Sequence, residues 1–444
     1  MGGRYYLIYR PVFLFPALRG QMLKDILDYL KNPFLIAAVA VSILIYSGLL
    51  PLRPKNPYAS MLPLESVIEL SGGISSNPSR FSSGRYYSAS IDLASVSALQ
   101  TSSLVTAEAS GQIKLWIPSE IVEALYPGKL FSLSGKSALI EKGEKIVCRG
   151  IWKEDYQCFL VSSLEHTGHG SGFWGSLEHF RALCRLIFKR LMYSWGEAGG
   201  LVLSLLSGSR EYLGDNVADS FRNAGLSHIL ALSGMHLSFF AGLSSKAGVS
   251  IMGKRWSKLF QAVGILFFIW FAGLSPSLFR AFLCSALALI AKGVFCCSTD
   301  TLEILSVSFL IHVCLIPDDA MTAAFMLSYG ALAGILVFSK ILHRFFSVIF
   351  PPKLSSSLSA STSAQILTAP ISLHLFGSFA PIGIIATVFA APLISVFLAL
   401  AIAGIILSLC MPFLSTVFGA IMNLLYGVIV WIVGLFASCP PVTT

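Results

Sequence analysis

Long uncharged runs of apolar residues dominate the hydrophobic pattern of this chain from residue 180 onward. Most are close to the length of about 20 residues that a helix needs to cross a bilayer. Residues 354–444 contain no Asp, Glu, Lys or Arg. A soluble fold needs surface charge, whereas a buried charge is costly in a bilayer, so the pattern predicts a polytopic α-helical membrane protein. The expected segments are residues 197–207, 226–245, 259–274, 276–297, 301–317, 320–341, 354–376, 379–409 and 413–438.

An earlier uncharged run, residues 33–50, is near the lower limit for a spanning helix. It follows a mixed, basic stretch, and no small-residue cleavage site comes before Pro51. We therefore expect a retained anchor rather than a removed signal peptide, with the N-terminus in the cytoplasm. Residues 1–52 would form this first unit.

Between residues 53 and 179 the pattern changes to short alternating apolar runs among Gly, Ser and charged residues. Over residues 53–178 the charges nearly balance, with eleven basic and twelve acidic side chains. This predicts a small all-β domain, inserted between membrane segments, and the lack of positive excess favours the extracytoplasmic side. The expected strands are residues 113–117, 130–134, 145–149 and 157–161, with turns at 127–128 and 143–144.

Two cysteines of this domain lie at equal sequence distances from Lys153. A hairpin turning at Lys153 would set Cys148 and Cys158 opposite each other, and in an oxidising compartment they could form a disulfide. The alternative is two unpaired thiols in a small core.

Residues 180–444 would form a multi-helix transmembrane domain. It opens with residues 180–192, where basic and apolar side chains alternate at helical spacing. Such a helix suits the membrane interface, and a basic helix facing DNA is the alternative. Residues 168–172 before it are typical of a linker. We expect solvated side chains and no metal at the histidines around it, His166, His169 and His179.

Composition and charge agree with a membrane protein. Hydrophobic residues make up 55% of the 444 positions and charged residues 12%, which excludes an ordinary soluble protein. The net charge of +9 is explained mainly by cytoplasmic loops. Four apolar segments separate the basic clusters at residues 246–258 and 340–353, with the acidic pair 318–319 between them, which fits basic loops inside and the acidic pair outside. Cys and His lack zinc-like spacing, so neither metal nor cofactor is expected.

Polar residues interrupt the apolar pattern most clearly at residues 205–237. Arg210 ends a Gly-Ser-Arg turn, and Arg222 closes an amphipathic stretch. His228 and His236 then enter a membrane segment eight residues apart, where they would share one helix face. Polar groups inside a membrane usually face a cavity or a partner helix, so this block is our first candidate for a path.

Further polar residues extend this path. Ser233, three residues before His236, and Gly234 form a natural point for a helix to break or pack closely. Arg280 follows a Pro-containing turn into an apolar helix, where a charge either snorkels to the interface or lines a path. Gln365 and Pro370 share a charge-free span, and the backbone groups freed by such a proline must meet protein or water.

These residues resemble the ComEC competence proteins, which form the inner-membrane channel for incoming single-stranded DNA. The resemblance covers residues 190–400 and rests on Gly208-Ser-Arg210 and on Phe221-Arg-Asn-Ala-Gly-Leu-Ser-His-Ile-Leu-Ala-Leu-Ser-Gly-Met-His236. Supporting matches are Gly273-Leu-Ser-Pro-Ser-Leu-Phe-Arg280, Phe325-Met-Leu-Ser-Tyr329, and Ala364-Gln-Ile-Leu-Thr-Ala-Pro370 with Pro392.

The resemblance implies a multi-pass protein of the bacterial cytoplasmic membrane that passes single-stranded DNA during natural transformation. It also implies that the β domain is OB-like, and that the partners are DNA, lipid, other competence proteins, a separate nuclease and further copies of the chain. No enzyme activity of its own is expected. The DNA-path candidates are Arg210, Arg222, His228, Ser233, Gly234, His236, Arg280 and Gln365.

Three departures from the family pattern keep other functions open. Ser209 stands where the family has Asp, Met326 where it has Gln, and Thr387 where it has Asn. The sequence also has no His-x-His-x-Asp-His motif of the metallo-β-lactamase-like domain that many relatives carry. The chain could instead transport another polyanion or have no uptake role. A different alternative is an intramembrane serine hydrolase that uses Ser233 and His236, although an orienting third group is not evident.

Overall fold

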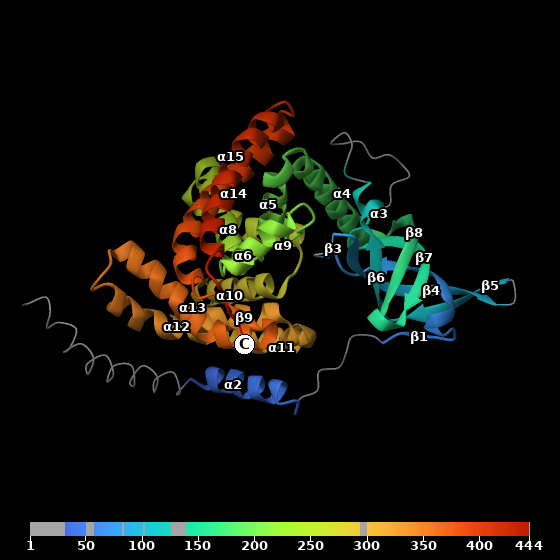
Figure 1. The fold of residues 1–444 in the computed structure, drawn as a ribbon, viewed down its shortest axis with the longest axis horizontal. Helices are drawn as coiled ribbons and strands as arrows, with labels where there is room; N and C mark the ends of the chain where they lie inside the picture. Colours follow the sequence, from blue (N-terminus) through green and yellow to red (C-terminus); the bar gives the residue numbers. More distant parts are fainter. Residues whose placement is uncertain are drawn as a thin grey trace, which may run out of the picture.

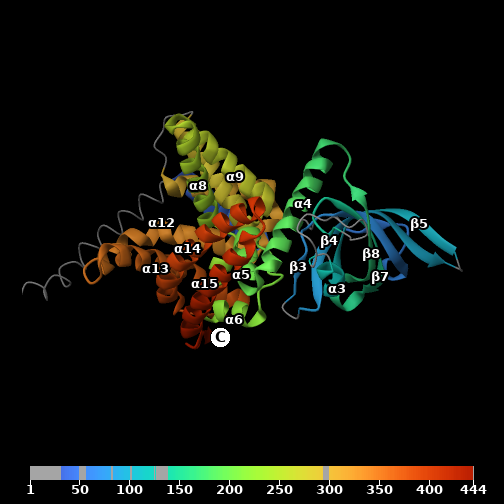
Figure 2. The ribbon, with the colours of Figure 1, turned by 90° about the horizontal axis from the view of Figure 1, so that it is seen from above.

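A computed structural model describes residues 32–49, 57–81, 84–100, 103–124, 126, 139–293 and 300–443. A β-rich unit and a larger helical unit lie side by side, and helix α4 (Gly172–Ser194) runs between them (Figure 1 and Figure 2). The basic N-terminal stretch, the expected strand at 130–134 and the expected turn at 127–128 lie outside the described residues.

The predicted β-rich region is confirmed. The expected strands at 113–117 and 145–149 lie within longer observed strands, and the one at 157–161 overlaps the start of β8, which begins one residue later. The strands are β1 (Ala59–Ser60), β2 (Val67–Ile74), β3 (Ser79–Arg80), β4 (Tyr86–Gln100), β5 (Ser103–Ser110), β6 (Gln112–Pro118), β7 (Glu144–Lys153) and β8 (Cys158–His169), with the short helices η1 (Leu64–Ser66), α3 (Ser119–Glu123) and η2 (Glu154–Tyr156).

Five of these strands close into a ring. β2 pairs antiparallel with β4 and β7, β4 pairs with β6, and β7 pairs with β8. The ring closes where β6 runs parallel to β8. Alternate side chains point inward, so Leu70, Ile91, Leu115 and Phe159 are fully buried in one apolar core.

The expected opposition of Cys148 and Cys158 is wrong. β7 and β8 form a hairpin, but its register pairs Cys158 with Lys153 and Cys148 with Leu164. The turn lies in η2, beyond Lys153, so the two cysteines are offset along the hairpin. Both are buried and free. Burial raises the pKa of Cys148 to about 12, which makes it an inert thiol.

The helical unit follows the predicted apolar segments closely. Its elements begin with α2 (Pro33–Tyr46), capped by the Asn32 side chain, and continue after α4. They are α5 (Gly196–Ser207), α6 (Asp215–Asn223), α7 (Ser227–Leu230), α8 (Gly234–Met252), η3 (Lys254–Trp256), α9 (Ser257–Ala272), α10 (Pro276–Gly293), α11 (Thr301–Leu315), η4 (Pro317–Met321), α12 (Ala323–Phe346), α13 (Pro352–Phe376), α14 (Gly383–Cys410) and α15 (Leu414–Ala437), with a small sheet of β9 (Ser378–Phe379) and β10 (Val442–Thr443).

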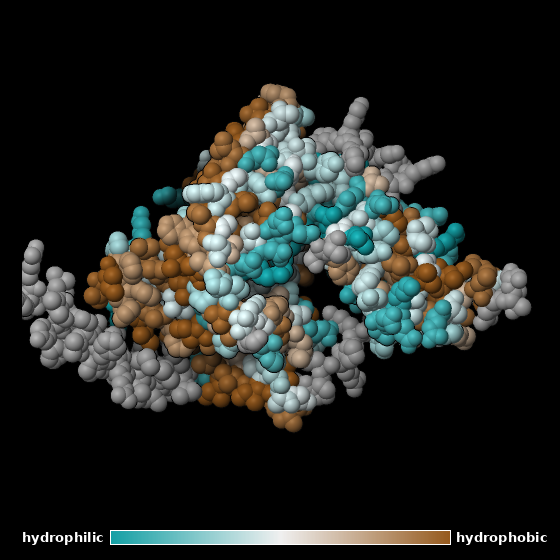
Figure 3. Space-filling view, in the orientation of Figure 1, coloured by the Kyte–Doolittle hydropathy of each residue, from teal (hydrophilic) through white to brown (hydrophobic). Residues whose placement is uncertain are grey.

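The helical unit contains helices that are suited to a membrane by their length and composition. Among the described residues, α12, α14 and α15 are long and apolar enough to cross a bilayer, and α2, α5, α10 and α11 are shorter apolar helices. Hydrophobic side chains cover much of its surface, while hydrophilic ones gather over α6 (Figure 3). α5 is buried at every residue from Ala198 to Ser207, and it packs in one core with α14 and α15.

The expected continuous helix over residues 226–245 is interrupted. α7 ends at Leu230, Ala231 adopts an extended backbone, and α8 begins only at Gly234. His228 and His236 therefore lie on two different helices rather than on one helix face. The break falls at Ser233 and Gly234, where the sequence offers both an N-cap residue and a small residue.

Candidate functional site

The basic face of α4 is buried, which corrects the prediction that it lies at the membrane interface or faces DNA. Arg181, Arg185, Lys189 and Arg190 all belong to the interior. α4 packs against the barrel on one side and against α5 and α9 on the other. The partners of its charges come from distant parts of the chain, so the local sequence pattern could not reveal them.

Four charged side chains form a buried network across this junction. Glu141, just before β7, receives a hydrogen bond from Arg185 Nε at 2.9 Å and lies 2.7 Å from Lys189 Nζ. Lys189 Nζ also lies 2.8 Å from Glu211 Oε1, in the loop after α5. Tyr126 OH donates to Glu211 Oε2 at 2.7 Å. Because these residues come from both units, the network fastens the barrel to the helical unit.

The cations around Glu141 control its ionisation. Burial alone would raise the pKa of Glu141, but Arg185 and Lys189 outweigh it and hold the pKa below its ordinary value. For Lys189, burial lowers the pKa, while Glu141 and Glu211 raise it, and the pKa ends above its ordinary value. Both partners therefore remain charged at neutral pH.

Arg185 also connects the family-like turn at Ser209 to α9. Its Nη2 donates to Ser209 Oγ at 3.2 Å, and its Nη1 donates to the Phe271 carbonyl at 3.0 Å. The last carbonyls of a helix lack partners within the helix, so a cation at the end of α9 is favourable. Ser209, one of the departures from the family pattern, thus still contacts a buried cation.

The histidines near the expected linker lie in β8 and α4 rather than in a loop; His169 is exposed, as expected, whereas His166 and His179 are partly buried. β8 continues to His169, and the fully buried Glu144 carboxylate lies 2.6 Å from His166 Nε2 and 2.9 Å from His179 Nδ1. His169 stacks on His179 with ring centroids 4.6 Å apart. In the described part of the chain, no group of three or more His, Cys, Asp and Glu is arranged to hold a metal ion.

The break before α8 creates a polar helix start inside the helical unit. The Ser233 side chain accepts from the His236 backbone N–H, and the Ser233 N–H donates to His236 Nδ1 at 3.2 Å. Since Nδ1 is an acceptor, the proton of a neutral ring is on Nε2. His236 is fully buried, and its Nε2 has no hydrogen-bond partner among the described residues.

Arg280 of α10 lies directly beside this helix start. A Cβ atom placed on Gly234 would lie 3.6 Å from Arg280 Nη2. Arg280 is 9% exposed, and its Nη1 donates a hydrogen bond to the Ser328 carbonyl. Its guanidinium carbon lies over the Tyr329 ring, 6.0 Å from the ring centroid. No carboxylate of the described residues pairs with Arg280, so it is a buried cation without a counter-ion.

A hydrogen-bonded chain leads from Tyr329 to the edge of the helical unit. The Tyr329 OH donates to the Ser308 carbonyl at 3.1 Å and lies 3.3 Å from His312 Nδ1. His312 Nε2 lies 3.1 Å from Asp319 Oδ2, which is partly exposed in η4. None of Ser308, His312 and Asp319 was among the predicted site residues. The available signal was a histidine inside an uncharged run, seven residues before an acid.

The predicted arginines at the start of the block lie outside the group formed by Ser233, Gly234, His236 and Arg280, which we call the Arg280 cluster. Arg210 and Arg222 are exposed, and they are close enough for their charges to repel. Arg222 also pairs with Asp219 at 3.3 Å on the same face of α6. His228 is exposed on α7. The structure therefore brings together four of the predicted path residues, Ser233, Gly234, His236 and Arg280.

Gln365 occupies a second point of close backbone approach. A Cβ placed on Gly383 would lie 3.0 Å from Gln365 Nε2 and 2.9 Å from the Gly225 carbonyl. Gly225 has φ +71°, which a residue with a side chain rarely adopts. The Gln365 side-chain oxygen is buried without a partner among the described residues. The block at 221–236 therefore contacts α14 as well as α10, and Gln365 of α13 lies beside the same glycine of α14.

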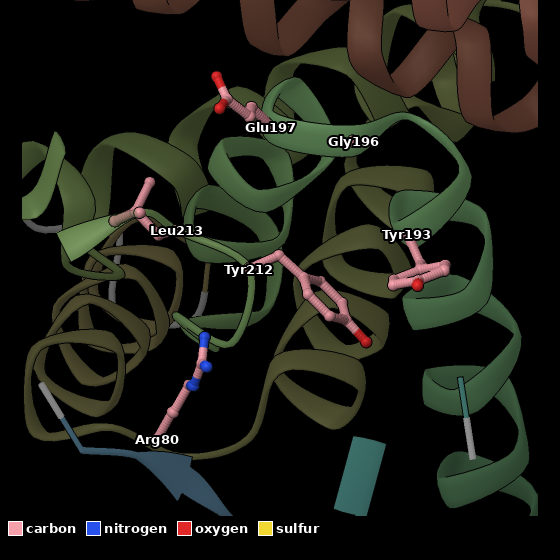
Figure 4. A pocket seen from close by; sticks show the side chains of 7 residues that line it. Arg80, Tyr193, Gly196, Glu197, Tyr212 and Leu213 are labelled. Atoms are coloured by element: carbon pink, nitrogen blue, oxygen red, sulfur yellow. The ribbon is translucent and has the colours of Figure 1, made fainter. Parts of the chain in front are cut away.

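A cavity of about 350 Å³ lies near the ionic network at the same junction. Arg80, Tyr193 and Tyr212 line it, and the rings of the two tyrosines lie 5.4 Å apart (Figure 4). The Arg80 guanidinium donates through Nη1 to the Glu211 carbonyl at 2.9 Å. Arg80 is thus largely satisfied by the protein itself, and the cavity belongs to the barrel–helix junction.

The comparisons with known proteins cover the 205–237 block. The model of the competence protein family matches residues 205–443, more than half of the chain. The chain therefore belongs to the competence protein family, and it is a competence protein of the ComEC type.

One curated relative supports this membership. The ComE operon protein 3 of Bacillus subtilis (strain 168) is 24% identical over 192 residues, which are 42% of this chain and 24% of that protein. The chain thus matches about a quarter of the length of that relative. No solved structure matches.

Proposed function

We propose that this chain is a multi-pass protein of the bacterial cytoplasmic membrane that passes single-stranded DNA inward during natural transformation. In this proposal the membrane part is the channel, and the chain performs no chemistry on the strand. Other competence proteins, including a separate nuclease, would act with it, and several copies of the chain could assemble.

The observation that carries the proposal is Arg280, a buried cation that has no acidic partner among the residues the structure describes. A charge inside a membrane domain is costly and is retained where it has a function. A strand crossing a bilayer brings one negative phosphate per nucleotide, and such a strand needs a cationic, polar lining. Arg280 and the unpaired Nε2–H of His236 could both donate to phosphate oxygens.

The exposed pair Arg210 and Arg222 supports the same proposal. Their charges repel each other in the free protein, so a phosphate placed between them would relieve that repulsion. Both belong to the block that contains Ser233 and His236. A strand could therefore meet these arginines before it reaches the buried cluster.

The β-rich unit would receive the strand outside the membrane. Its five-strand ring, with one parallel contact and a short helix between the third and fourth strands, supports an OB-like barrel. OB-like barrels bind oligonucleotides on one face, so this unit could hand the strand to the helical unit across the α4 junction.

The hydrolase alternative receives less support. A Ser–His catalytic pair needs a third group that orients the histidine, and the free Nε2 of His236 faces no such group among the described residues. Its Nδ1 instead closes the capping box of α8 with Ser233. Transport of another polyanion would use the same cationic cluster and is separated from DNA transport by the experiment below.

Gene deletion tests the proposed function. Cells that lack the gene should no longer take labelled DNA into the cytoplasm, and the wild-type gene should restore uptake. Complementation with Arg280→Gln or His236→Ala should restore it only weakly. Normal uptake of DNA in the deletion strain would contradict the proposal, and loss of another anion's uptake alone would favour the alternative transporter.

A further inference from the structure

We infer that an aromatic cluster on the outer face of the barrel is a base-stacking platform for single-stranded DNA. The cluster consists of Phe81, Tyr86, Trp116 and Tyr156, with Lys114 beside it. This inference rests on the proposed function, because it names the site at which the incoming strand first binds. We call the four rings and Lys114 the β6 platform.

The four rings come from separate segments and converge on Trp116. The Phe81 and Trp116 ring centroids lie 5.2 Å apart, those of Tyr156 and Trp116 lie 4.9 Å apart, and those of Tyr86 and Trp116 lie 6.1 Å apart. Trp116 alternates with the fully buried Leu115 and Ile117 along β6, so its side chain points out of the barrel. The cluster is therefore an outer surface and not part of the barrel core.

The platform occupies the position at which OB-like barrels bind oligonucleotides. That site is the face of the second and third barrel strands, flanked by the loops between strands one and two and between strands four and five. Here those strands are β4, which carries Tyr86, and β6, which carries Lys114 and Trp116. Phe81 belongs to the connection between β2 and β4, and Tyr156 to the turn between β7 and β8.

Cations beside the rings favour a nucleic acid over an uncharged ligand. Lys114 is exposed and its Nζ lies 5.8 Å from the Phe81 ring centroid. Two further cations near the platform, Arg85 and Lys153, are also exposed. The acidic residues Glu154 and Asp155 lie in the same turn as Tyr156. Every base has a flat face that stacks on an aromatic ring, and a nearby lysine meets the phosphate, so the site fits a single strand of any sequence.

Tyr156 is the most informative position for a test. It is 61% exposed, so its replacement removes stacking surface at little cost in folding. Tyr156→Leu keeps an apolar side chain but removes the ring, and Tyr156→Phe keeps the ring. Trp174→Leu is the matched control, because Trp174 is 75% exposed and lies on α4 outside the β6 platform.

The experiment measures binding of a dye-labelled oligothymidylate to the full chain in lipid nanodiscs by fluorescence anisotropy. Tyr156→Leu should weaken binding about tenfold, which corresponds to the stacking of one base, while Tyr156→Phe and Trp174→Leu should bind like the wild type. Lys114→Gln should lower the slope of log affinity against log salt by about 0.7, as expected for one lost phosphate contact on a single strand.

Three results would overturn the platform. The first is an affinity of Tyr156→Leu for the oligothymidylate equal to that of the wild type. The second is equal affinity of the wild type for an abasic strand of the same length. The third is tighter binding of a cell-wall oligosaccharide than of the oligothymidylate. Binding and uptake are separable in this design. If Tyr156→Leu binds the oligothymidylate more weakly, the platform is supported, even if DNA uptake does not depend on the chain. If Tyr156→Leu binds it as the wild type does and uptake still depends on the gene, the platform is overturned but the proposed function is not.

Discussion

At the scale of one residue, the role proposed for Arg280 and the stability of the protein oppose each other. Removing one partner of a buried ion pair leaves the other charge unpaired, but Arg280 has no acidic partner among the described residues. Replacing it by glutamine therefore removes a costly charge and leaves no carboxylate stranded. The stability and the activity of such a variant should change in different directions.

We therefore expect Arg280→Gln to unfold at the same temperature as the wild type or a higher one, and to lose at least tenfold in DNA uptake. The measurements are thermal unfolding in detergent and uptake of labelled DNA in complemented cells. Arg185→Gln is the matched control. It removes one of the two cations paired with the buried Glu141 carboxylate, leaves Lys189 as the other, and should lower stability by up to about 3–5 kcal/mol. Normal uptake with Arg280→Gln would show that this charge does not meet the strand.

Ser233 provides a second prediction at this scale. Loss of an N-cap costs about 1 kcal/mol, so Ser233→Ala should lower the free energy of unfolding by this amount and reduce uptake only in part. Ser238→Ala, five residues later, removes only a bond from the Ser238 hydroxyl to the Gly234 carbonyl and should have little effect. Complete loss of a proteolytic activity in Ser233→Ala would instead favour the hydrolase.

The sequence identified part of this residue-scale site. Arg280, Ser233 and His236 could be predicted because polar residues are conspicuous in apolar runs. His312 and Asp319 were missed as a pair, because their hydrogen bond depends on how η4 folds back after α11. The sequence shows which side chains are polar or charged, whereas the hydrogen-bond partner of each side chain depends on tertiary packing.

At the scale of elements, α4 is the clearest example of a pattern that suggested the wrong environment. Its alternation of basic and apolar residues predicted a helix with one polar face, and the helix does form there. The charged face meets Glu141 and Glu211 instead of water, lipid headgroups or DNA. Periodicity predicts which side chains share one face of a helix, but it does not specify what covers that face.

The ionic junction of α4 leads to a prediction about pH. Glu141 has a lowered pKa in the folded protein, so its contribution to stability is present above its unfolded pKa and is lost as pH falls through the folded value. Lys189 has a raised pKa, so its contribution is present below its unfolded pKa and is lost as pH rises through the folded value. Glu141→Gln should therefore flatten the acid side of the stability–pH curve and cost about 3–5 kcal/mol at neutral pH.

Chemical unfolding of the full chain across a series of pH values measures this effect. Glu69→Gln is the matched control, because Glu69 pairs with Arg149 at 2.7 Å on the surface of the barrel. An exposed pair of this kind contributes at most about 1 kcal/mol. Equal losses in both variants would contradict a structural role for the buried network.

At the scale of the whole molecule, the sequence predicted the division into a β-rich unit and a helical unit. Apolar runs without charge indicate helices in a membrane, and alternating runs between turns indicate strands. The closure of β6 onto β8 could not be predicted, because a parallel contact between distant strands has no local signal. The same limitation applies to the β6 platform, whose four rings are separated by up to 75 positions in the sequence.

The proposed passage of the strand along the Arg280 cluster can be tested directly at Gly234. A Cβ at Gly234 would meet only ordinary contacts, 3.5 Å from Ala281 Cβ and 3.6 Å from Arg280 Nη2, so Gly234→Cys should fold with its thiol beside Arg280. Gly242→Cys, on the same helix with nothing within 4 Å, is the matched control. Both are made in a chain whose nine native cysteines are replaced by serine.

The decisive measurement is crosslinking of these thiols to single-stranded DNA that carries a thiol-reactive group, during uptake by living cells. We expect a crosslink at Gly234→Cys that disappears when Arg280→Gln is added, and little crosslinking at Gly242→Cys. DNA uptake that proceeds with no crosslink at Gly234→Cys, or with equal crosslinking at both positions, would contradict the proposed passage.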